Sequence, residues 1–97
     1  MRKPFCFVMM PSGKHNEYAH GSQEADFIFK DIIVPAVQEV YGDQIEIHRE
    51  IDSRKPGAIT SAIIANIARS DIAIVDITGA NPNVFLELGI RFSLRNN

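Results

Sequence analysis

The sequence has few of the residues that would mark a disulfide-linked or metal-binding protein. It contains one cysteine and no tryptophan in 97 residues, so no disulfide can form within the chain. Cys6 lies in an apolar run, where a small core residue is the simplest interpretation. The three histidines have no metal-ligand spacing with Cys6. We therefore expect no metal site.

Excess charge and long hydrophobic runs are also missing. The net charge is −2, and lysine and arginine form no stripe, which argues against a nucleic-acid surface. Every apolar stretch is interrupted well before the roughly 20 residues that a membrane-spanning helix needs. The run that begins at Phe5 is too short and wrongly flanked for a signal peptide. We expect a cytoplasmic protein that binds neither nucleic acid nor a membrane.

What the chain has instead is a pattern of three β–α units. Residues 5–10 and 72–75 are apolar without alternation, as in strands covered on both faces, whereas residues 44–49 alternate polar and apolar. The expected strands therefore lie near residues 5–10, 44–49 and 71–76. A polar loop is expected over residues 14–23. Apolar residues at helical spacing predict helices over residues 25–41, 58–69 and 82–94. Pro35 predicts a kink in the first helix, or a helix that restarts there.

The order of these elements predicts an α/β fold. Strands joined by helices imply right-handed crossovers and a flavodoxin-like open parallel sheet with strand order 2-1-3. The third strand would then lie at an edge, although its sequence is as apolar as that of a central strand. We expect residues 1–97 to form a single domain that lacks its final strand or strands. Residues beyond Asn97, another domain or another subunit would cover the edge.

Glu87 is the residue where we would look for chemistry. The last predicted helix is apolar in most directions, and Glu87 shares its remaining stripe with Arg91, four residues later. One interpretation is a surface ion pair worth a few tenths of a kcal/mol. The other is a partly buried carboxylate that faces the crevice at the strand tips and stays ionised near the positive end of the helix. Such a carboxylate can act as a nucleophile or stabilise an oxocarbenium ion.

Polar residues flank this helix at the edge where open α/β sheets bind ligands. Asn81 is predicted to cap the helix, with Pro82 as its first residue. Asp76, at the end of the strand, either binds ribose hydroxyls or caps the following turn. Asp52 either faces the crevice or caps a turn before the second helix.

The turn Pro11-Ser12-Gly13 follows the first strand. It either offers backbone N–H groups to a phosphate or is a plain turn. No G-x-G-x-x-G, Walker A or G-x-S-x-G motif is present. The turn is therefore only a candidate substrate-binding segment.

Two stretches of the chain carry a recognisable pattern. One is Phe7-Val8-Met9-Met10-Pro11, and the other reads Asp76-x-Thr78-x-x-Asn81-Pro82-Asn83-Val84-Phe85-x-Glu87-Leu88-Gly89. Together they resemble bacterial domains of the nucleoside 2-deoxyribosyltransferase-like and TIR-like superfamily, from about Phe5 to Leu94. The resemblance implies that Glu87 is the catalytic carboxylate at the anomeric carbon of a ribosyl group. It also implies that Asp76 lies near the sugar and that Asn81 and Asn83 belong to the substrate-binding block.

One departure from the family pattern bears on the substrate. Deoxyribosyltransferases tend to carry an acid about six residues before the catalytic glutamate, where this chain has Asn81. A neutral base leaves poorly without a proton, whereas the nicotinamide of NAD is already cationic. We therefore expect cleavage of an N-glycosidic bond in a nucleotide such as NAD, with NAD as substrate and no cofactor. Nucleoside deoxyribosyl transfer and a non-catalytic nucleotide-binding or oligomerising module are the alternatives, and self-association is expected.

Overall fold

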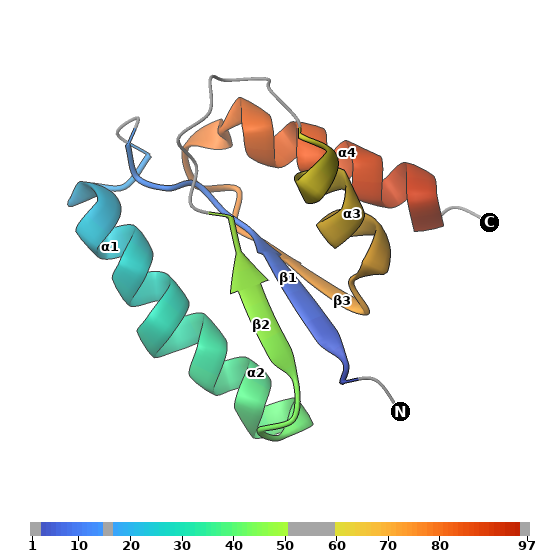
Figure 1. The fold of residues 1–97 in the computed structure, drawn as a ribbon. Coiled ribbons are helices and arrows are strands. Elements are labelled where there is room, and N and C mark those ends of the chain that lie inside the picture. The colour runs from blue at the N-terminus through green and yellow to red at the C-terminus, as the bar shows by residue number, and fades with distance from the viewer. Residues whose placement is uncertain (1–2, 15–16, 51–59, 96–97) are drawn as a thin grey trace.

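The structure is a computed structural model that describes residues 3–14, 17–50 and 60–95. Strands and helices alternate along the chain (Figure 1). The elements are β1 (Phe5–Met9), α1 (Gly21–Phe27), the π-helix η1 (Ile28–Ile33), α2 (Val34–Tyr41), β2 (Glu46–Arg49), α3 (Ser61–Arg69), β3 (Ile72–Val75), the 3-10 helix η2 (Thr78–Ala80) and α4 (Pro82–Arg95).

The three strands form one open sheet in the order β2-β1-β3, and both pairings are parallel. Cys6 of β1 lies opposite Ile47 on one side and Ile72 on the other. This confirms the predicted α/β class, the parallel pairing and the 2-1-3 order of a flavodoxin-like sheet. Within the described residues, β3 lies at an edge.

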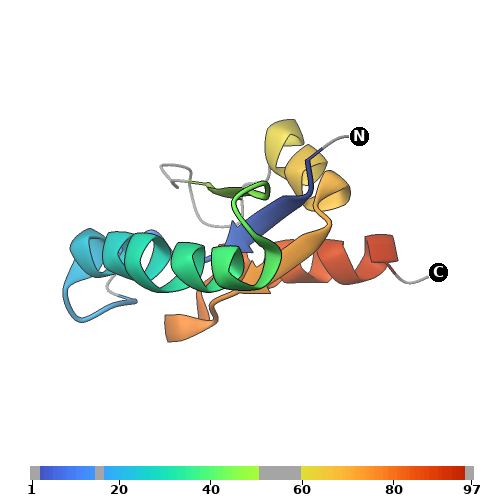
Figure 2. The ribbon, with the colours of Figure 1, turned by 90° about the horizontal axis from the view of Figure 1, so that it is seen from below.

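Helices cover both faces of the sheet. Side chains of β1 alternate between them: Cys6 and Val8 pack toward α1 and α2, whereas Phe5, Phe7 and Met9 pack toward α3. All five β1 residues are buried. Figures 1 and 2 show the helical run from α1 to α2 on one side of the sheet, with α3 and α4 on the other. β1 is therefore the centre of the core, as its unbroken apolar sequence predicted.

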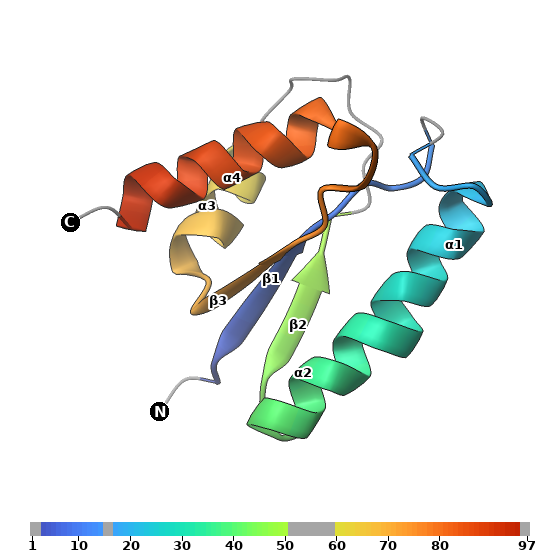
Figure 3. The ribbon, with the colours of Figure 1, turned by 180° about the vertical axis from the view of Figure 1, so that it is seen from behind.

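The first helical run begins earlier than predicted and is continuous to Tyr41 (Figure 3). It starts at Gly21, so the polar loop expected over residues 14–23 ends at His20. The disturbance predicted from Pro35 takes the form of η1, where the N–H of Val34 donates to the carbonyl of Phe29. Proline has no N–H to donate, and the wider π turn before it lets the helix continue rather than break.

The helix α3 begins with a side-chain cap. Thr60 Oγ1 accepts from the N–H of Ile63 at 3.2 Å, and the helix runs from Ser61 to Arg69. The part predicted over residues 58 and 59 lies outside the described residues. Ile63 and Ile67 are buried against β1, as their four-residue spacing predicted.

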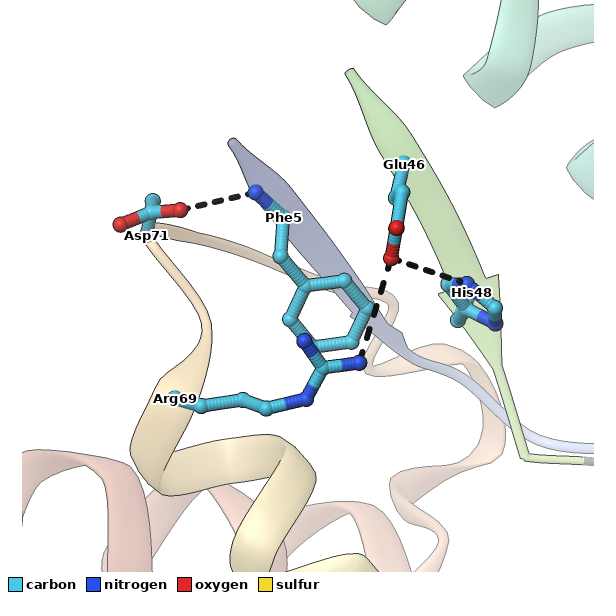
Figure 4. Close-up of polar contacts among 5 residues, drawn as sticks. All are labelled: Phe5, Glu46, His48, Arg69 and Asp71. Carbon is cyan, nitrogen blue, oxygen red and sulfur yellow. Dashed lines mark hydrogen bonds and ion pairs between the residues drawn. The ribbon is translucent and has the colours of Figure 1, made fainter. Parts of the chain in front are cut away.

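A polar cluster ties together the amino end of the sheet (Figure 4). Asp71 Oδ2 accepts from the N–H of Phe5 at 2.8 Å. The guanidinium of Arg69 lies 3.8 Å from the centre of the Phe5 ring and 4.0 Å from the carboxylate of Glu46. Half of the Arg69 side chain is exposed. This cluster marks the end of the sheet that lies away from the candidate site.

None of the helices that the structure describes has the length and apolar composition that crossing a membrane requires.

Candidate functional site

The carboxyl ends of β1 and β2 and the start of α4 enclose a narrow pocket. Its volume is about 10 Å³, which is enough for about one water molecule. The residues that line it are Val8, Met10, Glu50, Asn81, Asn83, Val84 and Glu87. Of the candidates that the sequence suggested, the structure therefore brings Glu87, Asn81 and Asn83 together here.

Glu87 lies on α4 and is buried, with 4% of its surface exposed. Glu87 and Arg91 are both buried, so the part of the ion-pair interpretation that places them on the surface is wrong. The Nη1 group of Arg91 donates to the carbonyls of Ile67 and Ser70 at 2.9 and 2.8 Å, and also to the Ser70 hydroxyl. Arg91 thus ties α4 to the end of α3, while Glu87 lines the pocket.

Asn81 caps α4, as predicted. Its Oδ1 accepts from the N–H groups of Asn83 and Val84 at 2.9 and 3.2 Å, and Pro82 is the first helical residue. Its Nδ2 donates to Glu17 Oε1 at 2.6 Å. The two halves of the amide therefore have different roles: one starts the helix that carries Glu87, and the other fixes the β1–α1 connection against it.

Both carboxylate oxygens of Asp76 accept hydrogen bonds from other residues of the chain. Oδ1 accepts from the backbone N–H of Thr78 at 2.9 Å and from its hydroxyl at 2.5 Å, whereas Oδ2 accepts from the phenol of Tyr18 at 2.6 Å. Burial raises the pKa of Asp76, but the hydrogen bonds from Thr78 and Tyr18 outweigh it and lower the pKa overall. The turn-capping interpretation of Asp76 is the one realised here. Contact with a sugar stays a prediction, since Asp76 does not line the pocket that holds Glu87.

The turn Pro11-Ser12-Gly13 lies close to the start of the first helix. Gly13 has φ +84°, and a Cβ there would lie 2.5 Å from the backbone carbonyl atoms of Gly21. Glycine is therefore required by this close approach as well as by the backbone angle. Ser12 Oγ accepts from the N–H of Lys14 at 3.3 Å. The turn-forming role is visible, and phosphate binding by the backbone of this turn stays a prediction.

A second, larger hollow lies on the α1 side of the same edge. Its volume is about 230 Å³. The residues that line it are Pro11, Ser12, Lys14, Ser22, Asp26, Arg49 and Glu50. Glu50 lines both the narrow pocket and this hollow, so the two adjoin at that residue.

Three residues of this edge were missed by the sequence interpretation. Glu50 directly follows β2, and the rule that pointed to Asp76 after β3 would have found it. Glu17 and Tyr18 lie in an irregular segment, where no periodicity reveals a contact about sixty residues away. The predicted site residue Asp52 lies outside the described residues.

The chemistry of this edge is that of oxygen and amide groups around a buried carboxylate. Among the described residues no three His, Cys, Asp or Glu side chains are grouped as a metal ion would need. A carboxylate shielded from water can stabilise positive charge strongly, because the surrounding dielectric is low. Comparisons of this chain with protein families, with curated proteins and with solved structures find no match.

Proposed function

We propose that this chain cleaves the N-glycosidic bond of a nucleotide such as NAD, with Glu87 as the catalytic carboxylate. The observation that carries the proposal is the burial of Glu87 at the carboxyl edge of the parallel sheet, in a pocket that it shares with Glu50. The resemblance to TIR-like and deoxyribosyltransferase-like domains supports the same assignment.

In the proposed reaction the bond between the anomeric carbon and the base nitrogen breaks, and its electron pair leaves with the base. Nicotinamide departs as a neutral molecule, so it needs no proton. Glu87 stabilises the developing positive charge on the sugar or bonds to the anomeric carbon. Water then supplies a hydroxyl group to that carbon and releases a proton.

The narrow pocket sets a condition on binding. Its volume of about 10 Å³ holds a water molecule and not a ribosyl group. Substrate therefore enters only when side chains at the rim move aside. Glu50 is an exposed residue of that rim and directly follows β2, so its side chain can rotate without disturbing the core.

Glu50 also favours a second candidate, nucleoside deoxyribosyl transfer. That reaction needs an acid near the leaving base, and Asn81 stands where the family pattern has one. Glu50 supplies a second carboxylate in the pocket of Glu87 without any residue beyond the described chain. Most glycosidases cleave the glycosidic bond with a pair of carboxyl groups that flank it.

The test incubates the protein with NAD and with deoxynucleosides and measures the released base by chromatography. We expect Glu87→Gln to lower base release by at least on the order of 10², because it removes the charge that faces the transition state. Glu39→Gln removes an exposed carboxylate from α2 and should leave the rate unchanged. Glu50→Gln should slow release of a neutral base more than release of nicotinamide.

Thermal unfolding of each variant shows whether a loss of rate merely reflects a loss of fold. Base release that survives Glu87→Gln undiminished in a folded protein would contradict the catalytic role. Absence of base release from every substrate tested would favour a non-catalytic nucleotide-binding module.

A further inference from the structure

Arg49 is the last residue of β2, and its cationic side chain is largely shielded from solvent. Its side chain is 9% exposed, and its guanidinium carbon lies 4.7 Å from the centre of the Phe29 ring. Its Nη2 group donates to Asp26 Oδ1 in an ion pair. This hydrogen bond lowers the pKa of Asp26 and therefore favours the ionised carboxylate. The ring and the carboxylate together fix the plane of the guanidinium.

Most of the hydrogen-bonding capacity of Arg49 is unused by the part of the chain that the structure describes. A guanidinium carries five N–H donors. Among the described residues, its only hydrogen-bond acceptor is Asp26. Leaving donors of a buried charged group without acceptors is costly, so a site of this kind is expected to hold an acceptor from elsewhere.

Arg49 lines the larger hollow. Besides Arg49 it is lined by the ammonium-bearing Lys14 and by the hydroxyl-bearing Ser12 and Ser22. Its volume of about 230 Å³ is below the roughly 300–1,000 Å³ of pockets that enclose a whole drug-sized ligand. It therefore suits one end of a ligand whose remainder lies elsewhere. The adjoining pocket at Glu50 is the place for that remainder once its rim side chains have moved aside.

We propose that the hollow beside Arg49 binds a phosphate group of the nucleotide substrate, so that the protein prefers phosphorylated over unphosphorylated nucleosides. This rests on the proposed function, which places the ribosyl group at Glu87. A phosphate group presents several acceptor oxygens in different directions, which the guanidinium fork, an ammonium group and two hydroxyls can meet together.

Phosphate binding in the hollow depends more on hydrogen-bond donors than on net charge, because the charges that line it are balanced. Asp26 and Glu50 offset Lys14 and Arg49, so the lining has no large net field to attract an arbitrary anion. Binding depends instead on hydrogen bonds from groups already fixed in place. Because Arg49 is held by Phe29 and Asp26, little of its conformational freedom remains to be lost on binding.

The experiment measures binding of AMP, adenosine and inorganic phosphate to the whole chain by calorimetry or chemical-shift titration. We expect AMP to bind at least about tenfold more tightly than adenosine, which corresponds to about 1.4 kcal/mol. Inorganic phosphate alone should bind more weakly than AMP. Arg49→Gln should abolish the preference for AMP, and Lys14→Gln, at an exposed residue of the loop, should reduce it.

Arg69→Gln is the matched control. Arg69 also stacks on a phenylalanine and lies near a carboxylate, but at the opposite end of the sheet (Figure 4). It should keep the full preference for AMP. Should Arg49→Gln prove unfolded, Arg49→Lys and Lys14→Gln test the same site with less disturbance of the contact to Asp26.

Three outcomes would overturn the proposal. They are equal binding of AMP and adenosine, inorganic phosphate that binds as tightly as AMP, and a preference that persists in folded Arg49→Gln. The failure of the two proposals is distinguishable. A preference for AMP without base release from NAD or deoxynucleosides supports the phosphate subsite and contradicts the glycosidase, whereas base release from NAD together with equal binding of AMP and adenosine does the reverse.

Discussion

The phenol of Tyr18 donates a 2.6 Å hydrogen bond to Oδ2 of Asp76, joining the β1–α1 connection to the turn that precedes α4. The neighbouring residue Glu17 accepts from Asn81 in the same region. Two consecutive residues of an irregular segment thus fix the turn that sets the start of α4. The placement of α4, and with it that of Glu87, depends on these contacts, which makes them suitable targets for mutation.

Removing the Tyr18 hydroxyl should destabilise the protein in a pH-dependent way. Burial and the bond to Asp76 raise the pKa of Tyr18, so the folded state favours the protonated phenol. This contribution is complete below the unfolded pKa of about 10 and is lost as the pH rises above it. Urea unfolding should show Tyr18→Phe about 1–3 kcal/mol less stable than the wild type at pH 7, with the difference shrinking above pH ~10.

Tyr41→Phe is the control, because Tyr41 is half exposed on α2. It should unfold like the wild type at pH 7. A difference between Tyr18→Phe and the wild type that stays constant up to pH ~11 would contradict the role of the buried phenol.

Asp76 should contribute stability at the opposite end of the pH scale. Its lowered pKa means that the folded state favours the carboxylate. The contribution is present above the unfolded pKa of about 3.9 and is lost as the pH falls through the lower folded value. Asp76→Asn should therefore cost about 1.5–3 kcal/mol at pH 7, and progressively less below pH ~4, in urea unfolding.

Asp43→Asn serves as a comparison at an exposed turn after α2. It should change stability little at either pH. If Asp76→Asn were as costly at pH ~2.5 as at pH 7, the charge of Asp76 would not be what stabilises the turn.

Asn81→Asp should separate the two roles of Asn81. The carboxylate keeps an acceptor for the α4 cap but places a negative charge beside Glu17 Oε1, which lies 2.6 Å from Nδ2 in the native structure. We expect a loss of about 1–3 kcal/mol at pH 7, because the amide donor is replaced by a like charge. Glu17→Gln in the same chain should restore most of it, since the new amide can donate to the carboxylate.

A double-mutant cycle by urea unfolding measures this coupling. Asn81→Ala provides the cost of losing the cap itself, about 0.5–2 kcal/mol. If Asn81→Asp lowered the free energy of unfolding equally in the wild type and in the Glu17→Gln variant, residues 17 and 81 would not be coupled.

The exposed face of α4 bears on the predicted self-association, which stays a prediction. Phe85 and Phe92, seven residues apart on one side of the helix, are 46% and 66% exposed. Apolar groups in such a patch favour association. Sedimentation velocity should show a concentration-dependent increase in mass, and Phe85→Lys with Phe92→Lys should reduce it without changing thermal stability. A monodisperse monomer at all concentrations would contradict the prediction.

The architecture follows from residue patterns that are visible in the sequence. Unbroken apolar runs such as Phe5–Met9 can be buried only when both faces of a strand are covered, and strands separated by helices must pair in parallel. The cap at Asn81 and the disturbance near Pro35 were also local consequences of residue chemistry. These features depend on residues that are close together in the chain.

Which polar side chains meet depends on how the helices pack on the sheet. A helical wheel places Glu87 and Arg91 on one stripe but cannot tell whether solvent or another helix lies against it. The carbonyls of Ile67 and Ser70, at the end of α3, accept hydrogen bonds from the buried Arg91. In the same way, no local pattern predicts that Tyr18 reaches Asp76 or that Arg49 lies beneath Phe29. Such contacts join segments that are distant in sequence, and their partners become neighbours only when the helices pack on the sheet.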